Sequence, residues 1–253
     1  MSIESDADKR EGIIEGRNAV IEALRSGVDI DKIFILKGDI DSTLKHIASK
    51  ARATGIVVVD ADKRKLDMMS NTGSHQGVVA MIAYAQYVSV SDILDVARQR
   101  GEEPLIIICD EISDPHNLGA IIRTCEATGA HGVIIPKRRS AGVNSTVAKA
   151  SSGAIFHIAI ARVSNLTATI KELKKAGVWV FAATMDGESS LWESDFTSAS
   201  AFVIGSEGTG ISRLVGENCD HKVNIPMAGN LSSLNASVSA AILLYETVRQ
   251  RKG

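Results

Sequence analysis

The sequence predicts an α/β protein with two domains, of which the second and larger is built on a parallel sheet. Three observations predict this fold class. Short aliphatic runs alternate with segments of helical periodicity along most of the chain. The aliphatic runs after residue 104 are continuous, which is typical of parallel strands buried on both faces. The chain has 253 residues, 45% of them apolar, so it is long enough for two small domains or one large one.

The first domain is expected over residues 12–85, after a frayed N-terminal tail. Asn18 is a capping-type residue in front of an apolar pattern that predicts a helix to Leu24. Strands rich in aliphatic residues and amphipathic helices then alternate. We expect strands at 32–36, 56–59 and 78–83, and helices at 42–53 and 63–69.

Residues 86–103 are expected to link the two domains, with one short helix at 92–99 followed by Gly101 and Pro104. The second domain is expected over residues 104–253. Its aliphatic runs predict strands at 105–109, 132–135, 155–159, 178–183, 201–205 and 223–226. Helical patterns lie between most of these strands, notably at 119–128, 165–176 and 235–250.

Composition excludes several classes of function. The net charge of −2 argues against a globally basic nucleic-acid binder, so any RNA contact must come from local patches. The three cysteines show no CxxC spacing and the six histidines no HExxH motif, so we expect neither a zinc site nor another metal centre. The N-terminus is polar, and no apolar run approaches the roughly 20 residues of a membrane span. We therefore expect a cytoplasmic protein without a membrane partner.

Polar residues gather in three segments, each directly after an expected strand. They are Asp114-Pro-His-Asn-Leu-Gly-Ala120 with Arg123, Gly205-Ser-Glu-Gly-Thr-Gly210, and Ile225-Pro-Met227 with Ser232-Ser-Leu-Asn-Ala-Ser237. Open α/β sheets bind ligands at the carboxyl ends of their strands, where these segments lie. The glycine-rich segment has neither the GxGxxG phasing of dinucleotide-binding folds nor a GxxxxGK[ST] motif.

Each of these polar residues also has an ordinary structural interpretation. Asn117 could cap a helix, Arg123 could be a surface residue, and Glu207 could be an exposed acid in a turn. Asn235 could be the N-cap of the last helix. Their joint occurrence in one order favours a functional site.

Taken together, the three segments resemble the SpoU (TrmH) branch of the SPOUT RNA methyltransferases over residues 105–251. Ala236 stands where valine is common in the family, and Cys125 where a small residue is usual, and neither departure touches the chemistry. Residues 16–20 and 74–77 resemble the family's small RNA-binding domain, which is similar to certain ribosomal proteins. The resemblance implies a deep trefoil knot in the C-terminal domain and a homodimer formed through that domain.

The resemblance implies methyl transfer from S-adenosylmethionine to a ribose 2′-hydroxyl, most of all that of a guanosine in 23S ribosomal RNA. Transfer RNA as the substrate stays open, as does a non-catalytic or resistance-type protein that binds ribosomal RNA. The implied cofactor-binding residues are Thr184, Gly205, Ile225, Met227 and Leu234. The implied catalytic residues are Asn117, Arg123, Glu207, Ser233 and Asn235.

The chemistry of these residue types suggests their roles. A guanidinium has a pKa above about 12, so Arg123 is a poor general base and is expected to hold an RNA phosphate bidentately. Asn117 and Glu207 are expected to hold the active geometry. Ser233 and Asn235 are expected to shape the floor of the cofactor site.

Two further features concern partners. The basic run Lys137-Arg138-Arg139 follows strand 132–135 at the same sheet edge, so it suits contact with RNA phosphates. In the first domain, Arg17 and His75 are candidates for RNA contact. In the last helix, apolar residues at helical spacing could face either a second copy of the chain or the sheet of their own domain. They are Val238, Ala241, Ile242, Tyr245 and Val248.

Overall fold

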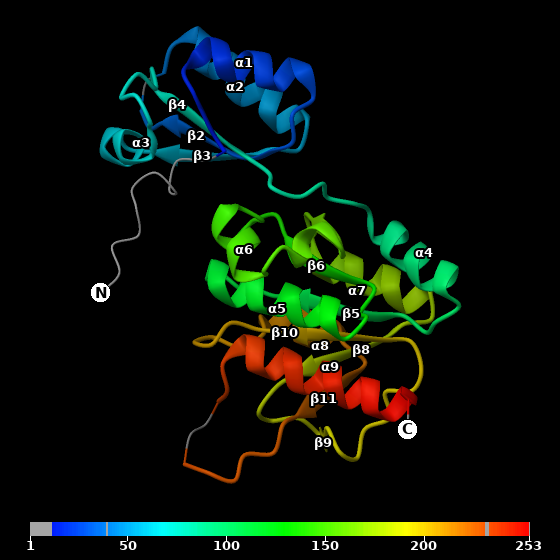
Figure 1. The fold of residues 1–253 in the computed structure, drawn as a ribbon. Helices are drawn as coiled ribbons and strands as arrows, with labels where there is room; N and C mark the ends of the chain where they lie inside the picture. The colour runs from blue at the N-terminus through cyan, green and yellow to red at the C-terminus, as the bar shows by residue number, and fades with distance from the viewer. Residues whose placement is uncertain (1–11, 39, 231–232, 253) are drawn as a thin grey trace. The chain divides into compact units, whose positions relative to one another are not determined.

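A computed structural model describes residues 12–38, 40–230 and 233–252 (Figure 1). The expected N-terminal tail and Ser232 lie outside the described residues. The chain forms two compact units, which divide between Gln86 and Tyr87, with residues 143–145 grouped with the first unit.

The first unit is a four-stranded sheet with helices on both faces. The sheet order is β1-β4-β2-β3, in which β4 runs antiparallel to β1 and β2, and β3 runs parallel to β2. Its elements are β1 (Ile13–Glu15), α1 (Arg17–Ser26), β2 (Ile30–Leu36), α2 (Ser42–Ala53), β3 (Val57–Ala61), α3 (Lys63–Met69) and β4 (Val78–Ile82). One core lies beneath α1 and α2, around Ile33 and Ile47, and a smaller one lies beneath α3, around Phe34 and Leu66.

Local signals explain where these helices begin. The carboxylate of Asp41 accepts a hydrogen bond from the backbone N–H of Leu44 at 3.1 Å, and Asp62 does the same for Lys65 at 2.7 Å. Such caps satisfy N–H groups that the first turn of a helix leaves unpaired. Asn18 lies inside α1 rather than at its N-cap, because that helix already begins at Arg17.

The second unit is built on a parallel sheet, as the aliphatic runs predict. Its order is β7-β6-β5-β10-β8-β11-β9, and every neighbouring pair is parallel. Its strands are β5 (Leu105–Cys109), β6 (Gly132–Pro136), β7 (Ala159–Val163), β8 (Trp179–Ala183), β9 (Ser189–Ser190), β10 (Ser200–Ile204) and β11 (His221–Asn224). Its helices are α4 (Val90–Arg100), α5 (Pro115–Ala127), α6 (Ser145–Ala150), η2 (Ala154–Phe156), α7 (Leu166–Lys175), α8 (Arg213–Asn218) and α9 (Ala236–Lys252).

Helices cover both faces of this sheet (Figure 1). Side chains of α4, α7 and α8 share one core with alternate residues of β5, β6, β8 and β10. Helices α5 and α9 contact each other, and they contact β6 and β10 respectively. The segment 86–103, which the sequence suggests as a linker, contains α4, and Ile93 of this helix is fully buried in that core.

One expected strand is wrong. Of the expected residues 155–159, only Ala159 lies in a strand, because a 3₁₀ turn over Ala154–Phe156 follows Gly153, which has a left-handed φ of 85°. Phe156 is 70% exposed, so the apolar residue that suggested a buried strand at this position is not buried. The strand of this region is β7, which pairs Ala159 with Gly132 of β6. Helix α5 also begins earlier than expected, at Pro115, because Asp114 caps it by accepting from the backbone N–H of His116 at 2.9 Å.

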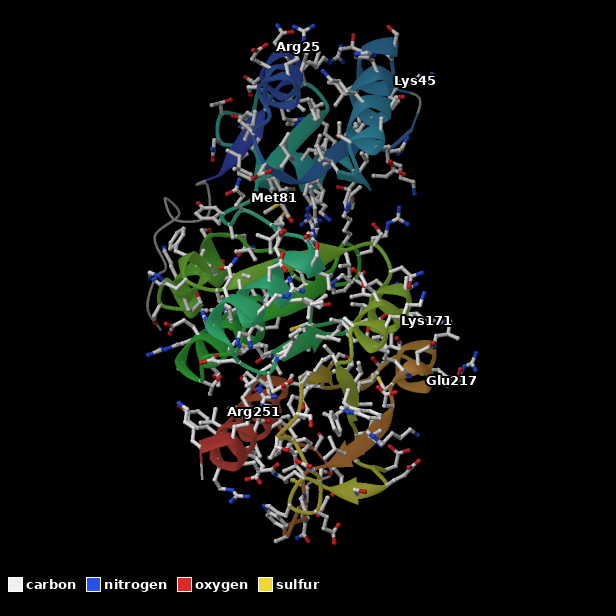
Figure 2. The ribbon with its side chains drawn as sticks, turned by 90° about the vertical axis from the view of Figure 1, so that its right-hand side faces the viewer. Arg25, Lys45, Met81, Lys171, Glu217 and Arg251 are labelled. Carbon is white, nitrogen blue, oxygen red and sulfur yellow. The ribbon has the colours of Figure 1, made fainter. Side chains whose placement is uncertain are left out.

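The last helix is fastened at its end by Arg251 (Figure 2). The guanidinium donates to the backbone carbonyls of Phe196 at 3.0 Å, Pro104 at 3.0 Å and Ser198 at 2.6 Å, and also to that of Glu103. A guanidinium presents five donors in a fixed plane, so one side chain can bind several backbone carbonyls near the starts of β5 and β10. None of the described helices is long and apolar enough to cross a membrane.

Candidate functional site

The three polar segments meet at one edge of the second sheet. They follow β5, β10 and β11, and β8 lies between the last two in the sheet order. The carboxyl ends of parallel strands lie at the same edge, so segments whose contacting residues are 28 to 118 positions apart in the chain come together there.

Asn117, Glu207 and Asn235 form a hydrogen-bonded cluster at this edge. The amide of Asn117 donates to Oε1 of Glu207 at 2.9 Å. The amide of Asn235 donates to Oδ1 of Asn117 at 2.9 Å and also to Oε1 of Glu207. Two amide donors therefore fix the orientation of one carboxylate, and each of the three segments supplies one member of the cluster.

Asn235 also has the structural role that its position suggested. Its Oδ1 accepts from the backbone N–H of Ser237 at 2.9 Å and from the Ser237 hydroxyl at 2.6 Å, so it caps helix α9. The cap and the cluster use different atoms of the same side chain. The folding of α9 therefore places the amide group that binds Glu207.

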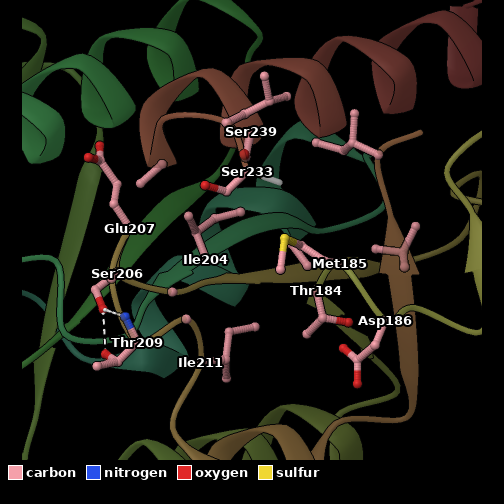
Figure 3. Close-up of a pocket in the computed structure, with 18 of the residues that line it drawn as sticks. Thr184, Met185, Asp186, Ile204, Ser206, Glu207, Thr209, Ile211, Ser233 and Ser239 are labelled. Carbon is pink, nitrogen blue, oxygen red and sulfur yellow. Dashed lines mark hydrogen bonds between the residues drawn. The ribbon is translucent and has the colours of Figure 1, made fainter. Parts of the chain in front are cut away.

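A cavity of about 480 Å³ lies beside this cluster (Figure 3). All five residues expected to bind a cofactor line it, together with Ser233, and Glu207 lines it too. The five are Thr184, Gly205, Ile225, Met227 and Leu234. Its size and its mixture of apolar walls with a few polar groups are typical of a site for a small organic ligand.

Two details of the cavity, one polar group and one closely packed glycine, favour a ligand site. The Thr184 hydroxyl is buried and has no hydrogen-bond partner among the residues that the structure describes, although nearly all buried polar atoms in proteins have one. Gly205 is packed so closely that a Cβ there would lie 2.2 Å from the carbonyl carbon of Gly210. The glycine at position 205 therefore lets the segment fold back on itself and leave the cavity open.

A second cavity of about 360 Å³ adjoins the first. Ser206, Glu207 and Ala236 line both cavities, and Asn117 lines the second. Glu111 and Arg139 also line the second cavity, and their side chains form an ion pair at 3.3 Å. The oriented carboxylate of Glu207 thus stands between two neighbouring binding spaces.

Two residues that no sequence motif singled out also build this edge. Asp110 is 3% exposed, and its Oδ2 accepts from the backbone N–H of Ser212 at 2.7 Å, which ties the end of β5 to the glycine-rich segment. Glu111 is the second such residue. Both directly follow strand 105–109, and this position at the carboxyl end of a strand is the signal that could have identified them. Burial, with the charge of Asp110 beside it, raises the pKa of the Cys109 thiol to about 12.

Other expected site residues lie outside the cavities. Arg123 is exposed on α5, about 9 Å along the helix axis from Asn117. It is not among the described residues that line either cavity. Lys137 and Arg138 follow β6, and Arg138 is exposed. In the first unit, Arg17 pairs with Asp41 at 2.6 Å.

His75 has a structural environment rather than an exposed one. Its side chain is 8% exposed. Nε2 lies 2.9 Å from the carboxylate of Asp67, and Nδ1 accepts from the backbone N–H of Gly77 at 3.0 Å. Both ring nitrogens are thus engaged inside the first unit, so the ring supports the turn before β4.

Comparison with known proteins agrees with this geometry. Residues 104–245 match the SpoU rRNA methylase family, and residues 13–88 match the substrate-binding domain of RNA 2′-O-ribose methyltransferases. The chain belongs to the SpoU family. This confirms the resemblance seen in the three loop segments, and it means that both units of this SpoU protein have counterparts in the family.

Three relatives illustrate the match. YacO of Bacillus subtilis (strain 168), named for the TrmH family of tRNA/rRNA methyltransferases, is 45% identical over 93% of this chain and 94% of its own. The AdoMet-bound rRNA methyltransferase from Sinorhizobium meliloti has a TM-score of 0.56 and 27% identity, and the match covers 96% of this chain and 88% of that one. The TrmH/SpoU tRNA-modifying enzyme of A. aeolicus has a TM-score of 0.55 and 32% identity, and covers 63% of this chain and 83% of its own.

The SpoU protein is therefore an S-adenosylmethionine-dependent RNA 2′-O-methyltransferase with an α/β fold. S-adenosylmethionine is its cofactor, as the sequence predicts. The trefoil knot implied by the resemblance stays a prediction.

Proposed function

We propose that this SpoU enzyme methylates the ribose 2′-oxygen of a guanosine in 23S ribosomal RNA. The observation that carries the proposal is the pair of adjoining cavities with Glu207 between them. One cavity has the size and lining of a cofactor site, and the other opens beside the same carboxylate. A methyl donor and an RNA acceptor would need this arrangement.

Coverage of the solved structures favours ribosomal over transfer RNA. The rRNA methyltransferase from Sinorhizobium meliloti matches nearly the whole chain, whereas the tRNA-modifying enzyme of A. aeolicus matches 63% of it. A protein that includes the substrate-binding unit over residues 13–88 therefore resembles the rRNA enzyme over more of its length. Transfer RNA remains the alternative outcome of the test below.

The first cavity would hold S-adenosylmethionine. The unpartnered Thr184 hydroxyl would bind one of the cofactor's polar groups, and Ile225, Met227 and Leu234 would contact its apolar surfaces. Gly205 would let the loop that borders the cofactor fold back against Gly210. The bound cofactor supplies an electrophilic methyl group on a sulfonium, so the protein's task is orientation.

The cluster of Asn117, Glu207 and Asn235 would orient the acceptor. The two amides hold the carboxylate of Glu207 at the boundary of the cavities. In this proposal a ribose hydroxyl in the second cavity donates its hydrogen bond to that carboxylate. Alignment of the hydroxyl with the methyl group could contribute up to about 7–11 kcal/mol to lowering the barrier. Ser233 would contribute to the wall of the cofactor cavity.

Arg123 would act on the RNA backbone. Because it is exposed on α5 and lies outside both cavities, it suits a phosphate that flanks the target nucleotide. An Arg123→Lys variant tests the bidentate geometry, since lysine keeps the charge and loses the planar fork. We expect lower turnover at unchanged affinity for S-adenosylmethionine. Full turnover with normal RNA affinity would contradict the bidentate contact.

Lys137 and Arg138 of the basic run would supply further phosphate contacts on the second unit, and Arg17 would do so on the first. Arg138→Ala should weaken RNA binding and flatten the dependence of affinity on salt, because fewer counterions are released. An unchanged salt slope would argue against this surface. The burial of His75 argues against a direct contact of its ring with RNA.

We also propose that the enzyme is a homodimer through the second unit. Helix α9 buries Ala240, Leu243 and Leu244 against its own unit, whereas Val238 is 44% and Tyr245 56% exposed. Part of the apolar stripe noted in the sequence therefore faces away from the sheet. Sedimentation of the full chain, alone and with Tyr245→Glu, tests whether a second copy covers these residues.

The proposed function is tested by mapping ribose methylation in RNA from cells with and without the protein. We expect one guanosine in 23S ribosomal RNA to lose its 2′-O-methyl group. Methylation should return with the wild-type protein and stay absent with Asn117→Ala, which removes a donor to Glu207. A lost methyl group in transfer RNA instead would overturn the choice of substrate.

A further inference from the structure

The second cavity has a wall that the methyl-transfer chemistry does not use. Glu111 and Arg139 line it but not the cofactor cavity, and their side chains form an ion pair at 3.3 Å. Glu111 is 30% and Arg139 83% exposed, so both can reach a ligand without leaving the pair. Neither residue belongs to the cluster of Asn117, Glu207 and Asn235.

Both residues have an unusual backbone. The φ angles of Glu111 and Arg139 are 58° and 57°, in the left-handed region that costs a residue with a side chain of order 1 kcal/mol or more. Only two other described non-glycine residues have a positive φ. Strained residues persist where surrounding structure fixes them, and they cluster at functional sites. Here the strain sets two opposite charges side by side in a cavity.

The chemistry of the pair selects among the RNA bases. A carboxylate accepts at both oxygens, and it has about four lone-pair positions, so the contact with Arg139 leaves acceptor capacity. A guanidinium only donates. The pair therefore presents acceptors beside a donor. Guanine is the one standard RNA base whose Watson–Crick edge has two adjacent donors, N1–H and the N2 amino group, beside the acceptor O6.

We propose that Glu111 and Arg139 recognise the target nucleoside as guanosine. The carboxylate of Glu111 accepts from N1–H and the N2 amino group, and the guanidinium of Arg139 donates to O6. Uracil offers one donor on this edge, and adenine and cytosine each place an acceptor next to a donor amine, so they leave part of the pair unsatisfied. This inference rests on the proposed function, because it assigns the base of the nucleoside that enters the second cavity. Enzymes that act on a base read its Watson–Crick edge by hydrogen bonds, and the Glu111–Arg139 pair would use contacts of the same kind.

The test compares guanosine with inosine, which lacks only the N2 amino group. A 23S ribosomal RNA fragment carrying the mapped target is assembled with either nucleoside at that position, and methyl transfer from radiolabelled S-adenosylmethionine is measured. For the wild-type chain we expect kcat/KM to fall roughly tenfold or more on inosine, because one hydrogen bond to a charged group is lost. The ratio between the two substrates is the readout, since a merely structural residue would lower both rates together.

Two variants of Glu111 separate recognition from folding. Glu111→Gly removes the carboxylate and suits the left-handed backbone, so the fold should persist. Glu111→Gln keeps the shape and replaces one acceptor by a donor. With Glu111→Gly the guanosine-to-inosine ratio should fall to about one, while affinity for S-adenosylmethionine stays unchanged. Glu217→Ala is the matched control, because Glu217 forms a similar pair with Arg213 on α8, away from both cavities, and should keep the wild-type ratio.

The outcomes distinguish this inference from the proposed function. A wild-type chain that methylates guanosine and inosine equally well overturns the role of Glu111 and leaves the methyltransferase function intact. A Glu111→Gly variant that slows both substrates while keeping the wild-type ratio does the same. Transfer to a nucleoside other than guanosine overturns both the inference and the choice of target. A ratio that collapses in Glu111→Gly alone supports the assignment.

Discussion

Replacing Gly205 by alanine should close the cofactor cavity. A Cβ at this position would lie 2.2 Å from the carbonyl carbon of Gly210 and 2.4 Å from its oxygen. Ordinary contacts of a Cβ begin at 3.4 Å, so the backbone around Gly210 would have to move by 3.4 − 2.2 = 1.2 Å. The atoms in the way are backbone, and Ser206 and Gly210 are held together by two hydrogen bonds of 2.9 and 3.1 Å, so the shift displaces the whole loop.

The magnitude follows from the cost of overpacking. Inserting a methyl group into a tightly packed place costs about 1–3 kcal/mol, and every 1.4 kcal/mol corresponds to a tenfold change in an equilibrium constant. If the loop moves to relieve the clash, it moves the wall of the cofactor cavity. We expect Gly205→Ala to bind S-adenosylmethionine roughly 5- to 150-fold more weakly, with a comparable or larger loss of turnover.

Gly216 on helix α8 provides the control, because it lines neither cavity. Among the described residues, a Cβ on Gly216 would meet only the side chain of Ile211, at an ordinary 3.8 Å, and its φ does not lie in the left-handed region. Gly216→Ala should therefore bind the cofactor like the wild type. Isothermal titration measures both affinities, and the shift of the unfolding temperature on adding S-adenosylmethionine gives an independent check. Wild-type affinity in Gly205→Ala, or equal loss in both variants, would refute the packing argument.

Three further predictions follow from other contacts. Asn235→Asp keeps the acceptor that caps α9 but sets a second carboxylate against Glu207. Turnover at neutral pH should fall at least tenfold and should partly recover in acid, where the two carboxylates can share a proton. A pH–rate profile like that of the wild type would contradict this. Hydrogen bonds from Arg249 lower the pKa of Glu246 from 4.5 to about 2, so this group stabilises the fold above pH 4.5 and the stabilisation is lost as the pH falls towards 2. The urea midpoint of Glu246→Gln should therefore approach that of the wild type over this range, and parallel curves would exclude the contribution. Burial raises the pKa of the Cys109 thiol to about 12, so a thiol reagent at pH 8 should label it only after unfolding, and rapid labelling of the native protein would show that it is accessible.

Much of the second unit could be predicted because its strands are continuous aliphatic runs. The run Leu105–Cys109 is buried at every position, so its composition alone indicates a central strand. Prediction failed where an apolar residue is exposed, as at Phe156, and where strands are very short, as with β1 and β9. The antiparallel placement of β4 in the first sheet depends on pairing across the chain, which local pattern does not contain.

The candidate site also has features that the sequence could predict and features that it could not. Strand ends meet at one edge of a parallel sheet, so the gathering of Asn117, Glu207 and Asn235 could be expected from their positions in the chain. The direction in which a side chain points from a helix surface could not be predicted in this way. Arg123, which we expected at the site, lies outside both cavities. The role of Glu111 depends on a left-handed backbone, which is rare for glutamate and which no sequence pattern here indicates.

The wall shared by the two cavities has a consequence for inhibitor design. Because Ser206, Glu207 and Ala236 line both cavities, a single compound could extend from one cavity into the other past these three residues. Joining a sulfonium mimic to a nucleoside by a short tether makes the second binding event intramolecular, with an effective concentration in the millimolar range for short flexible linkers. Neither half alone would gain this advantage, so affinity should depend steeply on tether length.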